Sequence, residues 1–189
     1  MIEIAKNAGF CFGVKRATDA LEEAIAARSG ERIYTLGTLI HNDVYNQQLA
    51  EAGVGITEIS QIPSLVATAT EEKPVRVLIR AHGIPKEDED LLRAMTRVNP
   101  HFRYEDCTCP FVKKIHRIAA EYSSPEHLFV LIGQASHPEV VGIMSYFEYD
   151  KLSFETAEDL QRAVEGGIFE KHLGKMPILA AQTTQNLGE

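Results

Sequence analysis

The chain has 189 residues, of which 44% are hydrophobic, enough for one domain or two small lobes with a core of their own. It carries a net charge of −8 and no Lys/Arg-rich run, which argues against a large nucleic-acid surface but leaves room for a local anion pocket. No apolar run approaches the ~20 residues of a membrane span and no signal peptide opens the sequence, so a cytoplasmic protein is expected. Three cysteines, an odd number, argue against a disulfide framework and leave the thiols for metal or redox chemistry.

Hydrophobic periodicity predicts alternating strands and helices along the chain. Strands are expected at 2–5, 32–36, 75–79, 102–105, 127–132 and 177–181. Helices are expected just after Cys11 and at 43–52, 86–98, 110–122, 138–147 and 156–164. The stretch 56–74 is the least periodic and is expected to mix loop with short elements. This alternation predicts an α/β fold with largely parallel sheets flanked by helices.

Two short segments resemble each other, and each places a cysteine between a strand and a helix. They are GFCFGVKRA, after the first predicted strand, and DCTCPFVKKIH, after the strand at 102–105. Two topologically similar lobes, each presenting a cysteine from the same kind of turn, would explain the similarity. Because the segments are short, a chance origin stays equally open.

The turn around Cys11 allows two interpretations. Glycines on both sides permit a tight turn and a close approach of a ligand to the backbone, and a helix N-terminus favours a thiolate. Alternatively, Cys11 is a small buried hydrophobic residue between Phe10 and Phe12. The turn by itself favours this second interpretation.

Residues capable of chemistry follow most of the predicted strands. They are Cys11, His41, His82, Cys107, Cys109, His137, Glu139, Gln182, Thr183 and Thr184. In open α/β sheets, ligands bind beyond the carboxyl ends of the strands, so these residues are expected to gather at one edge of the fold. We expect seven of them to line one pocket: Cys11, His41, His82, Cys109, His137, Glu139 and Thr183.

The residue types at these positions complement one another. Thiolates suit an iron–sulfur cluster or zinc, and imidazoles at helix starts suit a phosphate-bearing ligand. Glu139 can relay protons, and Thr183 can hydrogen-bond a substrate hydroxyl. A carboxyl so close to a helix N-terminus would need burial or a neighbouring anion, such as a bound diphosphate, to hold a proton.

The segments AGFCFGVKRA, LIHN, AHG, DCTCP, HPEVVG and QTT, in this order and spacing, closely resemble the 4-hydroxy-3-methylbut-2-enyl diphosphate reductases, the IspH or LytB family. The resemblance runs the length of the chain. Each motif alone is weak, but the six motifs in this order are very specific. It implies the last step of the non-mevalonate isoprenoid pathway, a two-electron reductive dehydroxylation that yields isopentenyl and dimethylallyl diphosphate. Ferredoxin or flavodoxin would supply the electrons.

The resemblance also implies roles for individual residues. Family members hold a [4Fe–4S] cluster by three cysteines, two of which match Cys11 and Cys109. Cys107 matches a position that need not be cysteine, although it would share one side of a strand with Cys109 and so stays a candidate substitute ligand. The histidines that grip the diphosphate match His41, His82 and His137. The proton-donating glutamate matches Glu139, and the threonine that orients substrate and protons matches Thr183.

The family fold has three α/β lobes in a trefoil-like arrangement, and its third cysteine lies in the third lobe. We therefore expect a chain truncated before that lobe, with a first lobe at 1–108 and a second at 109–189. Residues 1–12 are a candidate for packing against the third lobe. We expect such a chain to fold but neither to hold a stable cluster nor to be active alone.

Three other functions stay open from the sequence. A zinc hydrolase could use His41, His82 and His137, although the closely spaced histidines typical of zinc sites are absent. A cysteine-dependent phosphatase could use Cys11 and Arg16 as a phosphate loop, although the spacing is one residue short. A truncated reductase could also bind a diphosphate without catalysis.

Overall fold

The computed structural model describes residues 9–27, 29–40 and 42–184, which form two compact units. Unit 1 consists of Met1–Ala81 and Leu92–Cys109, and unit 2 of His82–Leu91 and Pro110–Glu189. The strand predicted at 2–5 lies outside the described residues. The assignment of 1–108 and 109–189 to two lobes of a three-lobed protein stays a prediction.

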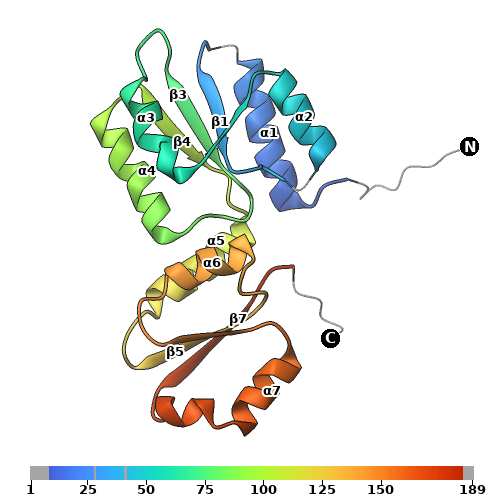
Figure 1. The fold of residues 1–189 in the computed structure, drawn as a ribbon, viewed down its shortest axis with the longest axis vertical. Helices are drawn as coiled ribbons and strands as arrows, with labels where there is room; N and C mark the ends of the chain where they lie inside the picture. Colours follow the sequence, from blue (N-terminus) through green and yellow to red (C-terminus); the bar gives the residue numbers. More distant parts are fainter. Residues whose placement is uncertain (1–8, 28, 41, 185–189) are drawn as a thin grey trace, which may run out of the picture. The chain divides into compact units, whose positions relative to one another are not determined.

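Unit 1 contains a four-stranded parallel sheet in the order β2-β1-β3-β4. Its strands are β1 (Arg32–Leu36), β2 (Gly55–Thr57), β3 (Val75–Ile79) and β4 (Phe102–Asp106). Helices α1 (Phe12–Ala26) and α2 (Asp43–Glu51) lie on one side of the sheet, and α3 (Ile62–Ala67) and α4 (Lys86–Val98) on the other (Figure 1). Residues of α4 up to Leu91 fall in unit 2.

The core of unit 1 forms where α1 packs on the sheet. Ala17 and Leu21 of α1, one turn apart on the same face, are fully buried against Leu39 and Leu78. Cys107 belongs to the same apolar cluster. This packing fixes the first turn of α1 relative to the segment that follows β4.

Unit 2 contains a three-stranded parallel sheet with β5 at its centre, in the order β6-β5-β7. Its strands are β5 (His127–Ile132), β6 (Lys151–Phe154) and β7 (Met176–Ala181). Helices α5 (Pro110–Glu121) and α6 (Pro138–Ser145) lie on one side of the sheet, and α7 (Ala157–Glu165) and the 3₁₀ helix η2 (Ile168–His172) on the other (Figure 1).

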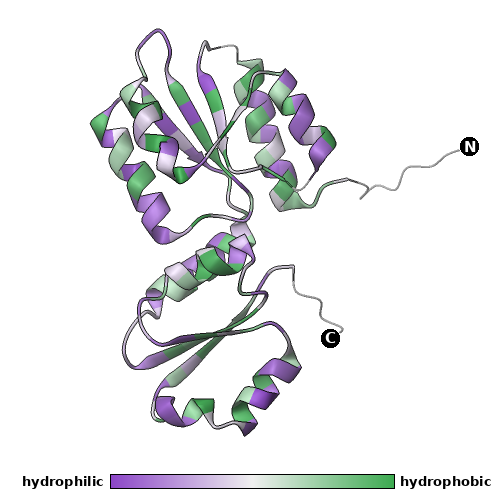
Figure 2. Cartoon of the chain, in the orientation of Figure 1, coloured by the Kyte–Doolittle hydropathy of each residue, from purple (hydrophilic) through white to green (hydrophobic). Residues whose placement is uncertain are grey.

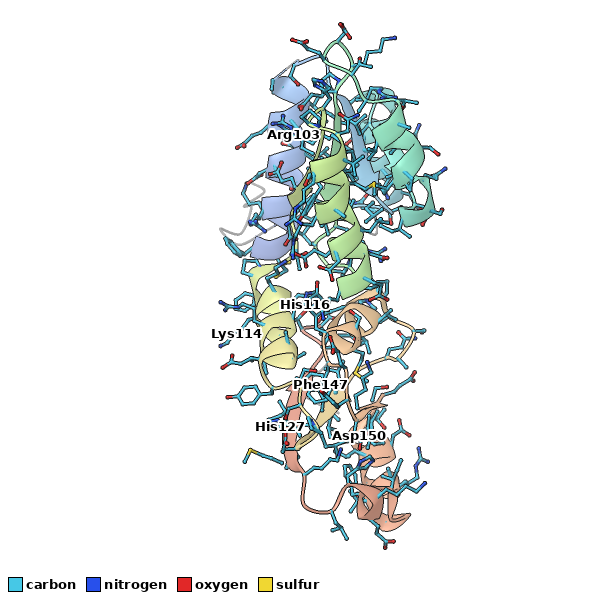
Figure 3. All side chains as sticks on the ribbon, turned by 90° about the vertical axis from the view of Figure 1, so that its left-hand side faces the viewer. Arg103, Lys114, His116, His127, Phe147 and Asp150 are labelled. Carbon is cyan, nitrogen blue, oxygen red and sulfur yellow. The ribbon has the colours of Figure 1, made fainter. Side chains whose placement is uncertain are left out.

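Each face of the unit 2 sheet has its own apolar cluster, and Figure 2 shows the hydrophobic strands between helices that alternate hydrophilic and hydrophobic residues. On the α5/α6 side, Phe147 (labelled in Figure 3) stacks on Phe129 with ring centroids 5.3 Å apart. His116 of α5 is 2% exposed and stacks on Tyr146 at 4.2 Å. The His116–Tyr146 pair joins α5 to the end of α6, and the Phe129–Phe147 pair joins the segment after α6 to β5.

The predicted α/β class with parallel sheets is confirmed, and most predicted elements agree with the structure to within two residues. Three strands have the predicted bounds: β1, β3 and β5. The stretch 56–74 contains short elements as expected, including most of β2, the 3₁₀ helix η1 (Ile59–Gln61) and α3. Strand β6, with only four residues, was not predicted. None of the helices in the described part of the chain is long and apolar enough to cross a membrane.

Candidate active site

Cys11 is the N-cap residue of α1 in unit 1. Its carbonyl oxygen accepts a hydrogen bond from the Lys15 N–H at 2.8 Å, the first bond of the helix, and its side chain is exposed. Phe10 and Phe12 are also exposed, by 48% and 65%. The interpretation of Cys11 as a small buried hydrophobic residue is therefore wrong, and its thiol is accessible to an incoming ligand.

Cys109 is half-buried in the loop that follows β4, also in unit 1. Its backbone N–H donates to the Ala81 carbonyl at 2.8 Å. The first turn of α1 lies directly against its side chain, since a Cβ placed on Gly13 would meet the Cys109 sulfur at 2.5 Å. Unit 1 thus brings Cys109 next to the helix turn that begins at Cys11.

Cys107 faces the interior of unit 1 and is 1% exposed. Burial, with a smaller contribution from the negative charge of Glu105, raises the pKa of the Cys107 thiol to about 12. Strand β4 ends at Asp106, so Cys107 and Cys109 do not share one side of a strand as expected. The geometry favours a structural role for Cys107.

Two of the predicted histidines lie together in unit 2. The rings of His82 and His137 meet edge to face, with centroids 5.5 Å apart and an interplanar angle of 80°. His137 is the N-cap residue of α6, and its Nδ1 accepts a hydrogen bond from the Glu139 N–H at 3.2 Å. Pro138, at the first helical position, has no N–H that would need a partner. His41 lies outside the described residues.

Glu139 lies in the first turn of α6 and is 1% exposed. Its two carboxylate oxygens accept hydrogen bonds from Thr183, at 2.6 Å from the backbone N–H and 2.9 Å from the hydroxyl. The carboxyl is therefore held at the end of β7 by a residue whose hydroxyl can pass a proton onward.

Gln182 ties together the loops that follow β5 and β7. Its side-chain oxygen accepts from the Gln134 N–H at 3.1 Å, and its Nε2 donates to the Thr184 hydroxyl at 2.7 Å. A Cβ at Gly133 would lie 2.8 Å from the Gln182 Cβ, so only glycine fits at the end of β5. This contact sets the distance between the loop leading to His137 and the loop carrying Thr183.

The structure thus brings the site residues together in two groups, one within each unit. Unit 1 holds Cys11 and Cys109, and unit 2 holds His82, His137, Glu139 and Thr183. Within 9–27, 29–40 and 42–184 there is no cluster of three or more His, Cys, Asp or Glu side chains that could hold a metal ion. That both groups line one pocket stays a prediction.

A model of one protein family, described as "LytB protein", matches residues 2–189. The chain belongs to the LytB family. Curated relatives named 4-hydroxy-3-methylbut-2-enyl diphosphate reductase agree with this membership. The protein of Clostridioides difficile is 38% identical over 191 residues and that of Aquifex aeolicus 36% over 188, each alignment covering 98% of this chain.

Two solved structures are similar as well. One, of (E)-4-hydroxy-3-methyl-but-2-enyl diphosphate reductase, is 34% identical, with a TM-score of 0.72 over 99% of this chain. The other, from Plasmodium falciparum, has a TM-score of 0.75 over 97% of the chain but 23% identity, and supports the fold alone. The chain spans 57–59% of the length of the two curated relatives above and 51–59% of these solved chains.

Sequence reasoning did not assign Gly13 or Arg16 to the LytB site. Arg16 entered only as part of a phosphate loop, yet its guanidinium donates to the carbonyl oxygens of Thr108 and Asp106 at 3.0 and 3.1 Å. This use of both terminal nitrogens does not fit a phosphate loop. No sequence spacing signals contacts between residues 90 and 92 positions apart.

Proposed function

We propose that this chain carries cluster-binding, substrate-binding and proton-donating residues of a 4-hydroxy-3-methylbut-2-enyl diphosphate reductase. The observation that carries the proposal is the buried Glu139 carboxylate, hydrogen-bonded twice by Thr183 and next to the paired rings of His82 and His137. The motif resemblance supports assigning them as the proton donor, its threonine partner and two of the diphosphate-binding histidines. The relatives of Clostridioides difficile and Aquifex aeolicus, both named 4-hydroxy-3-methylbut-2-enyl diphosphate reductase, support the same activity.

The thiols of unit 1 fit a [4Fe–4S] cluster as two of its ligands. Cys11 is exposed, Cys109 is half-buried beside the same helix turn, and thiolates are the donors that such clusters use. When bound, the cluster would supply two electrons and an iron to which the substrate's hydroxyl oxygen can coordinate. The third cysteine ligand that the resemblance implies is not found in this chain, whose remaining cysteine is the buried Cys107.

In unit 2, His82 and His137 are proposed to hold the diphosphate. Because Nδ1 of His137 accepts a backbone N–H, a neutral His137 ring carries its proton on Nε2 and can donate it to a phosphate oxygen. The N-terminus of α6 adds the field that favours an anion. His41 is assigned the same role from the motif match alone.

Glu139 and Thr183 are proposed to deliver protons. The net reaction consumes two electrons and two protons, breaks the carbon–oxygen bond of the allylic alcohol and releases the oxygen as water. Glu139, once protonated, can give its proton to the leaving hydroxyl, and the Thr183 hydroxyl keeps the carboxyl oriented. We further propose ferredoxin or flavodoxin as the electron donor and a cytoplasmic location.

The test compares this chain with a fusion that adds the segment of the Aquifex aeolicus relative lying beyond the matched region. Both are reconstituted anaerobically with iron and sulfide, then assayed with 4-hydroxy-3-methylbut-2-enyl diphosphate and a chemical reductant. We expect the fusion to hold about four irons and turn over, and the chain alone to do neither. A loaded fusion without turnover, or zinc-dependent hydrolysis of the substrate, would overturn the proposal.

A further inference from the structure

We propose that Arg16 and Gly13 are positioning residues that hold Cys11 and Cys109 as a preset thiol pair in unit 1, before any metal binds. The inference deepens the proposed function, on which its reference to an iron–sulfur cluster rests. The contacts that carry the inference all lie within unit 1. They can be tested with any soft metal ion that two thiolates bind, without the cluster.

Arg16 fixes the loop that carries Cys109. Its two terminal nitrogens donate to the carbonyl oxygens of Asp106 and Thr108, one on either side of Cys107. Such a fork of two charge-assisted hydrogen bonds holds both position and angle, which a lysine cannot reproduce. Because Arg16 lies in α1, five residues after the N-cap Cys11, its side chain ties the start of the helix to the cysteine loop.

Further hydrogen bonds, one within the loop and one to the segment after β3, also hold the loop that Arg16 contacts. The Asp106 carboxylate accepts the Thr108 N–H at 2.9 Å, and the Cys109 N–H donates to Ala81 at 2.8 Å. Cys107 anchors the middle of the loop in the apolar core beneath α1. Four hydrogen bonds and the burial of Cys107 therefore hold the backbone from Asp106 to Cys109.

Gly13 sets how closely α1 approaches Cys109. A Cβ at position 13 would lie 2.5 Å from the Cys109 sulfur and 2.9 Å from its Cβ. Rotating the Cys109 side chain could relieve the first clash but not the second, because the Cβ does not move with that rotation. An alanine would therefore push the first turn of α1, with Cys11 two residues before Gly13, away from Cys109.

If the thiol pair is preset, two changes should weaken metal binding without unfolding the chain. One is loss of the paired Arg16 hydrogen bonds, and the other is a side chain in place of Gly13. Outer contacts that orient metal ligands typically change metal affinity by about 10- to 100-fold when they are removed. Arg16 is exposed, so replacing it leaves the apolar core of unit 1 intact.

The probe is cadmium ion, titrated into the reduced 189-residue chain under anaerobic conditions and followed by thiolate-to-cadmium absorption. We compare the unsubstituted chain with R16K and G13A, and expect each to bind cadmium about 10- to 100-fold more weakly. R97K, at an exposed arginine of α4, and G142A, where a Cβ meets only ordinary contacts of 3.4 Å or more, are the matched controls and should bind normally. The double variant C11S/C109S should lose the absorption although Cys107 remains.

Circular dichroism and amide exchange establish that each variant is folded. If G13A fails to fold, R16K decides the question. Cadmium binding by R16K equal to that of R97K would overturn the proposal, as would absorption in the unsubstituted chain that does not depend on both Cys11 and Cys109. A fusion without reductase turnover would contradict the proposed function. It would not contradict the preset thiol pair, which is tested by cadmium binding to the 189-residue chain.

Discussion

Thr183 binds Glu139 twice, donating its backbone N–H to one carboxylate oxygen and its hydroxyl to the other. Both groups are in unit 2, and the carboxylate is 1% exposed. The two donors differ in kind. The backbone N–H can only donate, whereas the hydroxyl can also accept, and this difference determines which substitutions the pair tolerates.

Glu139→Gln should keep the fold and lose the reaction. The glutamine oxygen can accept the Thr183 N–H while its NH₂ donates to the Thr183 hydroxyl, so the contacts remain and only the transferable proton is lost. In the loaded fusion we expect turnover to fall by about 10²- to 10⁴-fold, with the free energy of unfolding nearly unchanged. The control Glu139→Ala leaves buried donors unsatisfied and should destabilise unit 2 by about 1–3 kcal/mol. Near-normal turnover of Glu139→Gln would remove Glu139 from the proton path.

His137 should be found with its proton on Nε2 when neutral, because Nδ1 accepts the Glu139 N–H. Long-range ¹H–¹⁵N spectra of the chain at mildly alkaline pH report the tautomer directly. His137→Asn retains a helix cap but removes the Nε2 donor, so affinity for inorganic pyrophosphate should fall about five- to tenfold. His101→Asn, in unit 1, is the control and should bind as the unsubstituted chain does. A proton on Nδ1 would contradict the assignment.

Glu31 should make the stability of unit 1 depend on acid pH. Its carboxylate, 7% exposed, pairs with Arg103 at 2.6 Å and with Arg76 at 3.2 Å (Arg103 is labelled in Figure 3). Burial alone would raise the pKa of Glu31, but hydrogen bonds from Arg103 and Ser29 and the charge of Arg76 outweigh it and leave the pKa below its ordinary 4.5. The resulting stabilisation is complete above pH 4.5 and is lost as the pH falls through the lowered pKa.

The measurement for Glu31 is amide exchange of β1 and β3 in Glu31→Gln and in the exposed control Glu71→Gln. We expect Glu31→Gln to lower the opening free energy at pH 7 by about 1–3 kcal/mol, since it removes a mostly buried charge from two arginines. The difference from the unsubstituted chain should shrink as the pH falls below 4.5. A difference that stays constant down to the acid unfolding of the chain would refute the linkage.

The three thiols should react with N-ethylmaleimide in order of exposure: Cys11 first, Cys109 next and Cys107 last. Since Cys107 is reachable only through opening of unit 1, its labelling should be at least about 100-fold slower than that of Cys11. Peptide mass spectrometry over a time course measures all three in one sample. Labelling of Cys107 as fast as that of Cys109 in the folded chain would show that the loop after β4 is open.

The elements that the sequence predicted well are those with strong local signals. Strands β3 and β5 are dense in valine, leucine and isoleucine, and α7 begins with Thr156 and Asp159, which form the expected capping box. The missed strand β6 has four residues, and β2 has three. Such strands are defined by pairing with β5 and β1, contacts that a local window does not contain.

The same distinction applies to the site. Strand exits and motifs identified the residues that could act, such as Glu139 and Thr183, but not the contacts that orient them. The ring of His137 as a helix cap, the Gln182 link between two loops and the contact of Gly13 with Cys109 all join segments through tertiary packing. The exposure of Cys11 likewise depends on what packs around the turn, which the sequence of the turn alone does not contain.

The interleaving of the two units has a consequence for how the chain is made. His82 and the segment up to Leu91 belong to unit 2, but they leave the ribosome before β4, the last strand of unit 1. At about 5–20 residues per second, the 55 residues from His82 to His137 take roughly 3 to 11 s to synthesise. During that interval unit 1 can fold, with Cys107 and Cys109 in place. His82 cannot yet pack against the ring of His137, which has not been synthesised. We therefore expect the cysteine loop to be completed first and the histidine pair to form later during biosynthesis.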